Sequence, residues 1–259
     1  MTIEEKIRTL DLSLFDGKGI NCQIHNDDKR TLLTVQNAIR NQVEAYTYLE
    51  IGSHMGGSIQ PHLIDPKCEC IYSIDLRPAS QPDDREKAYI AYYENNSTAR
   101  MLDLLSNIDK ASVVKIKCFD SDASNVNIME IEKKPQIVFI DGEHTKRAVI
   151  SDFNFCMQVI ADNGVILFHD AGIVYPGIQA IMRSLKKNGK KFVPALLDGF
   201  IFMIAFDKQA IELYPPLNEM YLRNYKFLKL LPIKKYFPRF LIKFGRHLQR
   251  SRFRIANLN

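Results

Sequence analysis

Five short apolar runs recur along the chain, and each ends in small or polar residues. They are AYTYLEIG (45–52), CIYSIDL (70–76), SVVKIKCF (112–119), PQIVFIDG (135–142) and GVILFHDAG (164–172). The runs are too short for helices, and several lack the alternation of a half-exposed strand. This pattern predicts strands that are buried on both faces of a sheet.

Segments with helical spacing of apolar residues separate most of these runs. Helices are predicted over residues 27–42, 85–107, 145–164 and 176–188. Strands that alternate with helices are typical of a parallel α/β sheet. The segment KFVPALLDGFIFMIAFD (191–207) instead predicts two strands around the turn Asp198-Gly199, which is a hairpin signal. We therefore predict an α/β fold with a doubly wound, mostly parallel seven-stranded sheet, closed by an antiparallel C-terminal hairpin.

Composition is ordinary for a globular protein of 259 residues, with 46% apolar and 25% charged residues. The start MTIEEKIRTLDLSLF is charged where a signal peptide would be apolar, and no run reaches the roughly 18 apolar residues of a membrane span. The five cysteines lack zinc spacing, which favours reduced thiols and a cytoplasmic location. Cys68 and Cys70 form a CxC pair just before a predicted strand, and we interpret them as core and edge residues rather than as ligands of a metal or redox partners.

The charge is unevenly distributed. From Met220 onward the chain holds 11 Lys or Arg and no Asp or Glu, although the net charge of the whole chain is only +5. Basic and aromatic residues alternate over 221–254, a pattern that suits peripheral contact with an anionic membrane at the inner face. Packing of this segment on its own acidic body or on a second subunit of a homo-oligomer is the alternative. Nucleic acid is not expected, because nothing resembles an RNA-recognition module.

The stretch TYLEIGSHMGGSIQP (47–61) carries the first candidate site. Its glycines follow the first strand and precede a helix predicted to start near Ser58, so unpaired backbone N–H groups would lie at the strand's carboxyl edge. Asp75 ends the next strand, at a distance along the chain that suits an acid binding ribose hydroxyls. The alternative for the glycines alone is an ordinary tight turn.

Two side chains indicate which nucleoside would bind. A dinucleotide loop reads GxGxxG, whereas this loop has His54 at the middle glycine position, which hinders a pyrophosphate. Glu50, just before the loop, would repel phosphates and attract an ammonium group. Adenosine attached to a cationic amino acid satisfies this arrangement better than NAD does.

These residues resemble a known family. LEIGSHMGGS is similar to the first motif of class I S-adenosylmethionine-dependent methyltransferases in its catechol-type form, and SIDLR is similar to the second motif. IVFIDGEHTKRAVISDF with GVILFHD resembles the sugar, polysaccharide and macrolide-sugar O-methyltransferases. The resemblance implies a cofactor site that includes Glu50, Gly52, Ser53, Gly56 and Ser58 around the methionine end, Asp75 at the ribose, Asp120 and Ser121 at the adenine, and Asp141.

Polar residues also end the fourth and fifth strands. Asp141 follows one strand, and His169 with Asp170 follows the other, so all three should meet at the ligand crevice. The resemblance implies a divalent cation, Mg or Mn, held by Asp141 and Asp170, and His169, which departs from the family's pattern, is the third candidate ligand. Imidazole suits magnesium poorly, and the alternative is that both acids bind the cofactor amine, water or a helix end.

His144 follows in the sequence DGEH. This DxxH spacing resembles that of the macrolide-sugar methylating enzymes, and the resemblance implies that His144 is a general base assisted by Asp141. The alternative is that His144 caps the next helix.

We expect an O-methyltransferase acting on a sugar, glycan or glycosylated small molecule. A non-catalytic nucleoside-binding or membrane adaptor and an NAD-dependent oxidoreductase are the other hypotheses. The expected organisation is an N-terminal cap or substrate segment (1–30), the methyltransferase domain (31–210) and a basic aromatic tail (211–259).

Overall fold

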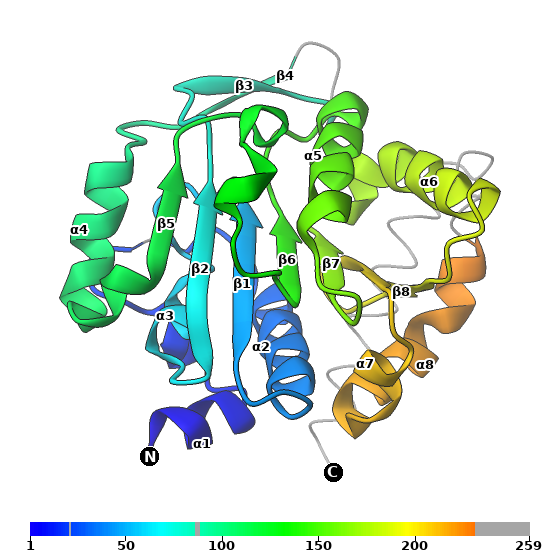
Figure 1. Cartoon of the computed structure of the whole chain (residues 1–259), viewed down its shortest axis with the longest axis horizontal. Helices are drawn as coiled ribbons and strands as arrows, with labels where there is room; N and C mark the ends of the chain where they lie inside the picture. Colours follow the sequence, from blue (N-terminus) through cyan, green and yellow to red (C-terminus); the bar gives the residue numbers. More distant parts are fainter. Residues whose placement is uncertain (21, 86–88, 231–259) are drawn as a thin grey trace.

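A computed structural model of the protein describes residues 1–20, 22–85 and 89–230 (Figure 1). Its main sheet has seven strands in the order β5-β2-β1-β6-β7-β9-β8. The first five strands of this order pair in parallel, and β9 runs antiparallel to both β7 and β8. The strands are β1 (Tyr46–Ile51), β2 (Cys68–Ile74), β5 (Ile116–Phe119), β6 (Ile137–Ile140), β7 (Val165–Phe168), β8 (Val193–Leu196) and β9 (Phe202–Ala205). The predicted fold class and the closing hairpin are confirmed.

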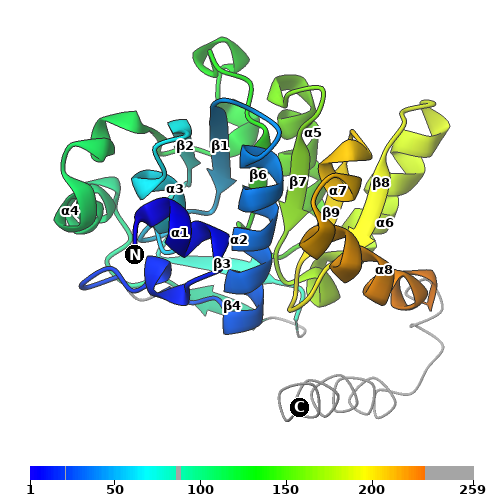
Figure 2. The ribbon, with the colours of Figure 1, turned by 90° about the horizontal axis from the view of Figure 1, so that it is seen from below.

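Helices cover both faces of the sheet, which explains why the central strands are apolar throughout. Figure 2 shows α1 and α2 on one side of the sheet and α5 on the other. The helices are α1 (Ile3–Arg8), α2 (Asn26–Arg40), α3 (Gln60–Ile64), α4 (Thr98–Asp109), α5 (Lys146–Val159), α6 (Ala171–Lys187), α7 (Gln209–Glu212) and α8 (Pro215–Leu230). Short 3-10 turns lie at Leu12–Phe15, Ser112–Lys115, Ala123–Asn125 and Ile128–Glu130.

The hydrophobic core has two layers, one on each face of the sheet. The side chains of Tyr46 and Tyr48 enter the layer beneath α2, whereas those of Leu49 and Ile51 enter the layer beneath α5 and α6. Cys68 and Cys70 both lie in β2, are buried, and belong to opposite layers. Both cysteines are thus core residues, and they lie within the strand rather than just before it.

A second, two-stranded sheet crosses the carboxyl ends of the main strands (Figure 1). It consists of β3 (Ser80–Asp83) paired with β4 (Tyr89–Tyr92). The prediction of one helix over 85–107 is wrong in its first half, because β4 occupies part of it and α4 begins only at Thr98. Ser97 caps that helix by accepting a hydrogen bond from the backbone N–H of Arg100, and the aromatic run before it fits a strand equally well.

Two further helix boundaries differ from the prediction. The helix α6 begins at Ala171 rather than near 176, so Pro176 lies inside it. The helix after the glycine loop is only five residues long and starts at Gln60, two residues beyond Ser58. Within the described part of the chain, no helix combines the length and apolar character needed to cross a membrane. Most of the predicted basic segment, from residue 231, lies outside the described residues.

Candidate cofactor and active site

A cavity of about 620 Å³ opens at the carboxyl ends of β1, β2 and β6, beneath the β3–β4 hairpin. Its walls come from the glycine loop, the end of β2, the hairpin, the turn after β5 and the first turns of α5. Of the predicted cofactor residues, the lining includes Gly52, Asp75, Ser121 and Asp141. The cavity is therefore where the sequence places the nucleoside site.

Gly52 is required by the backbone geometry of this cavity. It has a φ of +86°, and a Cβ added to it would lie 2.3 Å from the backbone oxygen of Asp141. Only glycine combines that conformation with so close a neighbouring backbone. The loop consequently packs directly against the backbone that follows β6, where the paired strands β1 and β6 end.

Glu50 lies beneath the loop rather than in the cavity wall. Its side chain is buried and accepts hydrogen bonds from the Tyr48 hydroxyl (2.9 Å) and from Ser58. Burial outweighs these hydrogen bonds and raises the pKa of Glu50 to about 8. Ser53 is likewise buried, where its hydroxyl contacts Ser73 at 2.5 Å. The roles of Glu50, Ser53, Gly56 and Ser58 in cofactor binding remain predictions.

Asp75 is fixed at the cavity wall by backbone groups. Its two carboxylate oxygens accept hydrogen bonds from the N–H groups of His54 and Arg77, each at 2.8 Å. Both donors have positive φ, at 44° and 57°, which residues with side chains seldom adopt. Asp75 therefore stabilises two unusual backbone turns and keeps its carboxylate beside the cavity.

Arg77 is a site residue whose role the sequence pattern did not reveal. Its side chain is 7% exposed and lies 3.5 Å from carboxylate oxygens of both Asp75 and Asp120. It also donates to the backbone oxygen of His54. Asp120 is itself more than half exposed and is absent from the cavity lining, whereas its neighbour Ser121 is present. Arg77 thus links Asp75, the acid predicted to bind the ribose, to Asp120 in the segment predicted to contact the adenine.

Asp152, on α5, also lines the cavity, and no sequence pattern drew attention to it. The residue is 9% exposed, and among the described residues no hydrogen bond or ion pair is formed by its carboxylate. Burial, together with the nearby Asp122 and Glu143, raises the pKa of Asp152 to about 7. The cavity therefore contains a carboxyl group that is largely protonated below neutral pH.

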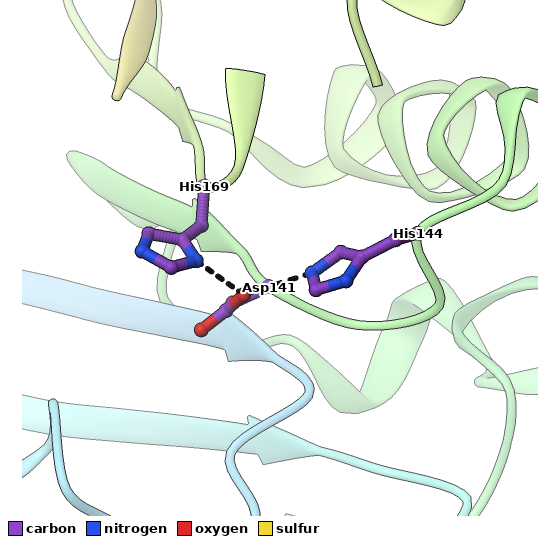
Figure 3. Close-up of side chains that lie close together, drawn as sticks. All are labelled: Asp141, His144 and His169. Carbon is purple, nitrogen blue, oxygen red and sulfur yellow. Dashed lines mark hydrogen bonds and ion pairs between the residues drawn. The ribbon is translucent and has the colours of Figure 1, made fainter. Parts of the chain in front are cut away.

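Asp141, His144 and His169 meet at the ends of β6 and β7, where both rings point toward the carboxylate (Figure 3). The Nδ1 of His169 lies 2.9 Å from the Asp141 carboxylate, and the Nε2 of His144 lies 3.3 Å from it. Burial opposes the charge on Asp141, but the two histidines outweigh it and lower its pKa to about 2. The pKa values of both histidines are raised: burial opposes their charge, and the facing carboxylates outweigh it.

The second nitrogen of each histidine faces another acid. His144 Nδ1 lies 3.0 Å from Asp83, and His169 Nε2 lies 3.7 Å from Asp28. Although His169 is 9% exposed, neither of its buried ring nitrogens has a well-aligned hydrogen-bond partner among the described residues. Asp141 is therefore shared by two histidines, each of which faces an acid on its far side.

The three residues Asp141, His144 and His169 place one ligand atom each within 4.8 Å of one another, as a metal site requires. The unaligned nitrogens of His169 fit this arrangement. Asp170, the third predicted ligand, is outside the group and pairs with Arg85 at 3.0 Å. One carboxylate and two imidazoles favour manganese, iron or zinc over magnesium. The metal role of these residues is a prediction that the geometry permits.

Solved structures share this fold. The calicheamicin methyltransferase CalS11 superposes with a TM-score of 0.54 and 13% identity, covering 79% of this chain and 93% of that one. The O-methyltransferase NovP superposes with a TM-score of 0.56 and 12% identity, covering 79% of this chain and 99% of that one. The sheet order, the closing hairpin and the cavity at the strand ends define a class I methyltransferase fold.

Sequence comparison agrees with the fold. Residues 49–171, just under half of the chain, match the model of a family described as a methyltransferase domain. This stretch of the chain is therefore similar to a methyltransferase domain, in agreement with the fold. An uncharacterized protein, R132 of Acanthamoeba polyphaga mimivirus, is 29% identical over 126 residues. That match spans 48% of this chain and 51% of the viral protein.

Proposed function

We propose that the protein transfers a methyl group from S-adenosylmethionine to a hydroxyl group, with His144 as the general base. The observation that carries this proposal is the position of the His144 imidazole. Its Nε2 lies at the end of β6, beside a cavity-lining carboxylate, and its Nδ1 is held by a second acid. An imidazole so placed can take the proton of an attacking hydroxyl.

The chemistry divides between positioning and proton transfer. The acceptor oxygen forms a bond to the methyl carbon as the carbon–sulfur bond breaks, and the hydroxyl proton passes to His144. Asp75 and the glycine loop would hold the donor, so that correct alignment supplies much of the acceleration. In the absence of the donor, Asp141 raises the pKa of His144; a positive charge beside Asp141 would lower that pKa and favour the neutral imidazole, whose Nε2 can accept a proton.

A sugar hydroxyl is the acceptor that we propose, either in a glycan or in a glycosylated small molecule. CalS11 is described as a TDP-rhamnose 3'-O-methyltransferase, and it shares the fold with a TM-score of 0.50 and 11% identity over 79% of this chain and 94% of that one. That activity accords with the resemblance of the DGEH segment to sugar-methylating enzymes. The identity of the sugar is the least constrained part of the proposal.

A divalent cation is compatible with the site. Asp141 and His169 would hold it, and Asp170, the third predicted ligand, pairs with Arg85 through one carboxylate oxygen. When bound, such an ion would lower the pKa of the acceptor hydroxyl. His144 is the remaining member of the group, and its role as a base requires that it stays outside the metal's coordination.

The proposal is tested by calorimetry with S-adenosylmethionine, followed by a methyl-transfer screen over nucleotide sugars and glycans. His144→Ala should lower kcat by roughly 10²- to 10⁴-fold, the usual contribution of a general base, and leave the cofactor affinity nearly unchanged. A variant that keeps most of its activity would remove the base assignment. Binding of NADH but not of S-adenosylmethionine would favour the oxidoreductase hypothesis, and cofactor binding without turnover on any acceptor would favour the adaptor.

The basic segment 221–254 suggests a location for this activity. We propose that it binds anionic lipid, which would bring the enzyme to lipid-linked or surface glycans on the cytoplasmic side of a membrane. In its described part, at the end of α8, Leu222 is 60% exposed and Phe227 is 45% exposed, beside the basic residues Arg223 and Lys226. Apolar and basic side chains side by side suit a lipid headgroup region.

A further inference from the structure

The β3–β4 hairpin is joined to the loop that carries His144. A parallel bridge pairs Asp83 with His144, and the N–H of Asp84 donates to the backbone oxygen of His144 at 2.9 Å. The Asp84 side chain accepts a hydrogen bond from the N–H of Lys146, also at 2.9 Å. The hairpin is therefore held to this loop by backbone contacts and by Asp84, independently of the Asp83 side chain.

The Asp83 carboxylate contacts the imidazole of His144. Its side chain is 2% exposed. One oxygen accepts a hydrogen bond from the backbone N–H of Arg85 at 2.7 Å, and the other oxygen lies 3.0 Å from Nδ1 of His144. The Arg85 guanidinium lies 3.5 Å from the oxygen that faces the imidazole. A buried carboxylate fixed in this way holds its partner in one orientation.

We propose that Asp83 is a positioning residue that orients the base and selects its tautomer. A carboxylate accepts hydrogen bonds but donates none, and Asp83 lies closer to Nδ1 of His144 (3.0 Å) than Asp141 lies to Nε2 (3.3 Å), so Asp83 favours the proton on Nδ1. In the neutral imidazole, Nε2 is then the nitrogen with a free lone pair, and Nε2 is the atom that faces the cavity-lining residue Asp141. This inference rests on the proposed function, because it matters for catalysis only if His144 is the base.

The β3–β4 hairpin, which carries Asp83, also forms part of the cavity wall. Gln81, Pro82 and Tyr93 line the cavity from the same hairpin that carries Asp83. A ligand that settles against this wall therefore contacts the element that sets the orientation of the base. Through Asp83, the position of the hairpin would then determine whether His144 is oriented to accept the proton.

The test compares three variants. In Asp83→Asn the amide N–H₂ can donate to Nδ1, which would move the imidazole proton to Nε2, the wrong atom for a base. Asp83→Glu keeps a carboxylate. Asp84→Asn is the matched control, because it alters the contact to Lys146 and leaves the imidazole partner intact.

Two measurements separate positioning from simple structural support. We expect Asp83→Asn to lower kcat on the order of 10²-fold, with cofactor affinity and acceptor KM changed by less than about threefold. We expect Asp83→Glu to recover part of the loss and Asp84→Asn to stay near wild type. Unchanged kcat in Asp83→Asn would overturn the inference, as would equal losses of kcat and cofactor affinity in all three variants.

The second measurement does not depend on turnover. Nitrogen NMR of the histidine rings, at a pH where His144 is neutral and with S-adenosylhomocysteine present, reports which ring nitrogen carries the proton. We expect Nδ1–H in the wild type and a shift toward Nε2–H in Asp83→Asn. If the wild type binds cofactor but methylates nothing, the proposed function fails while this experiment still decides the tautomer. An Nε2–H tautomer in the wild type would overturn the role of Asp83.

Discussion

Gly52 packs so closely on Asp141 that any side chain at this position would meet a backbone oxygen. A Cβ would lie 2.3 Å from that oxygen, and the φ of +86° adds a conformational penalty. We expect Gly52→Ala to lower stability by several kcal/mol, since it combines a left-handed alanine with a steric clash, and to abolish cofactor binding. Denaturant unfolding and calorimetry with S-adenosylmethionine measure the two effects.

Gly189 provides the matched control. It also has a positive φ, of 64°, but a Cβ there would have no atom within 4 Å. Gly189→Ala should therefore cost only about 1 kcal/mol and leave cofactor affinity unchanged. Equal effects of the two substitutions would mean that the close approach to Asp141 has no special consequence.

The main sheet was predictable because its determinants are local. Each core strand is a short apolar run that ends in small or polar residues, and the parallel topology then places Asp75, Asp141 and His169 at one edge. The Asp198-Gly199 turn marked the closing hairpin in the same way. Residues at strand ends could thus be assigned to the site without coordinates.

The structural features that the sequence pattern did not predict depend on contacts between segments that are distant in the sequence. Asp83 meets His144 across 61 positions in the sequence, and no periodicity signals that pairing. The aromatic run 89–93 has apolar residues at helical spacing, yet it forms β4 because it pairs with β3. Hydrogen bonds from Tyr48 and Ser58 hold Glu50 beneath the loop, an arrangement that the sequence pattern did not show, and the role of Glu50 in cofactor binding stays a prediction.

The group formed by Asp141, His144 and His169 leads to a prediction about metals. If a divalent ion is used, EDTA should lower activity, and Mn²⁺ should restore it better than Mg²⁺ because the site offers nitrogen donors. Calorimetry should show Mn²⁺ binding to the wild type and a loss of at least tenfold in affinity for His169→Ala. His62→Ala is the control, since that histidine is buried elsewhere, stacked on Tyr48. Full activity in EDTA with no Mn²⁺ binding would remove the metal.

Asp152 should make stability depend on pH. Its pKa is raised from 3.8 to about 7 by burial first and by neighbouring acids second, so the folded protein binds this proton more tightly than the unfolded chain does. The stabilisation is fully present below pH 4 and is lost as the pH rises through 7. Asp152→Asn removes this dependence. Relative to wild type, we expect the variant to gain roughly 2–4 kcal/mol on going from pH 5 to pH 8.

Denaturant unfolding at both pH values measures this gain. Asp162→Asn is the control, because Asp162 is exposed and its substitution should change stability equally at the two pH values. A wild type and an Asp152→Asn variant with parallel pH profiles would show that Asp152 is already ionised in the folded protein.

The basic segment gives the prediction that separates membrane contact from self-packing. The protein should sediment with vesicles that contain anionic phosphatidylserine and should not sediment with neutral phosphatidylcholine vesicles. Each Lys or Arg near the surface contributes up to about 1 kcal/mol, and salt weakens the attraction because the screening length falls to roughly 3 Å at 1 M.

A variant that ends at Leu230 keeps the buried contacts of α8, including Leu217 and Asn224, but loses eight of the 11 basic residues. We expect this variant to keep its cofactor affinity and to lose vesicle binding. If it sediments as well as the full chain does, lipid binding does not reside in the segment beyond α8, and the membrane proposal for that segment is removed.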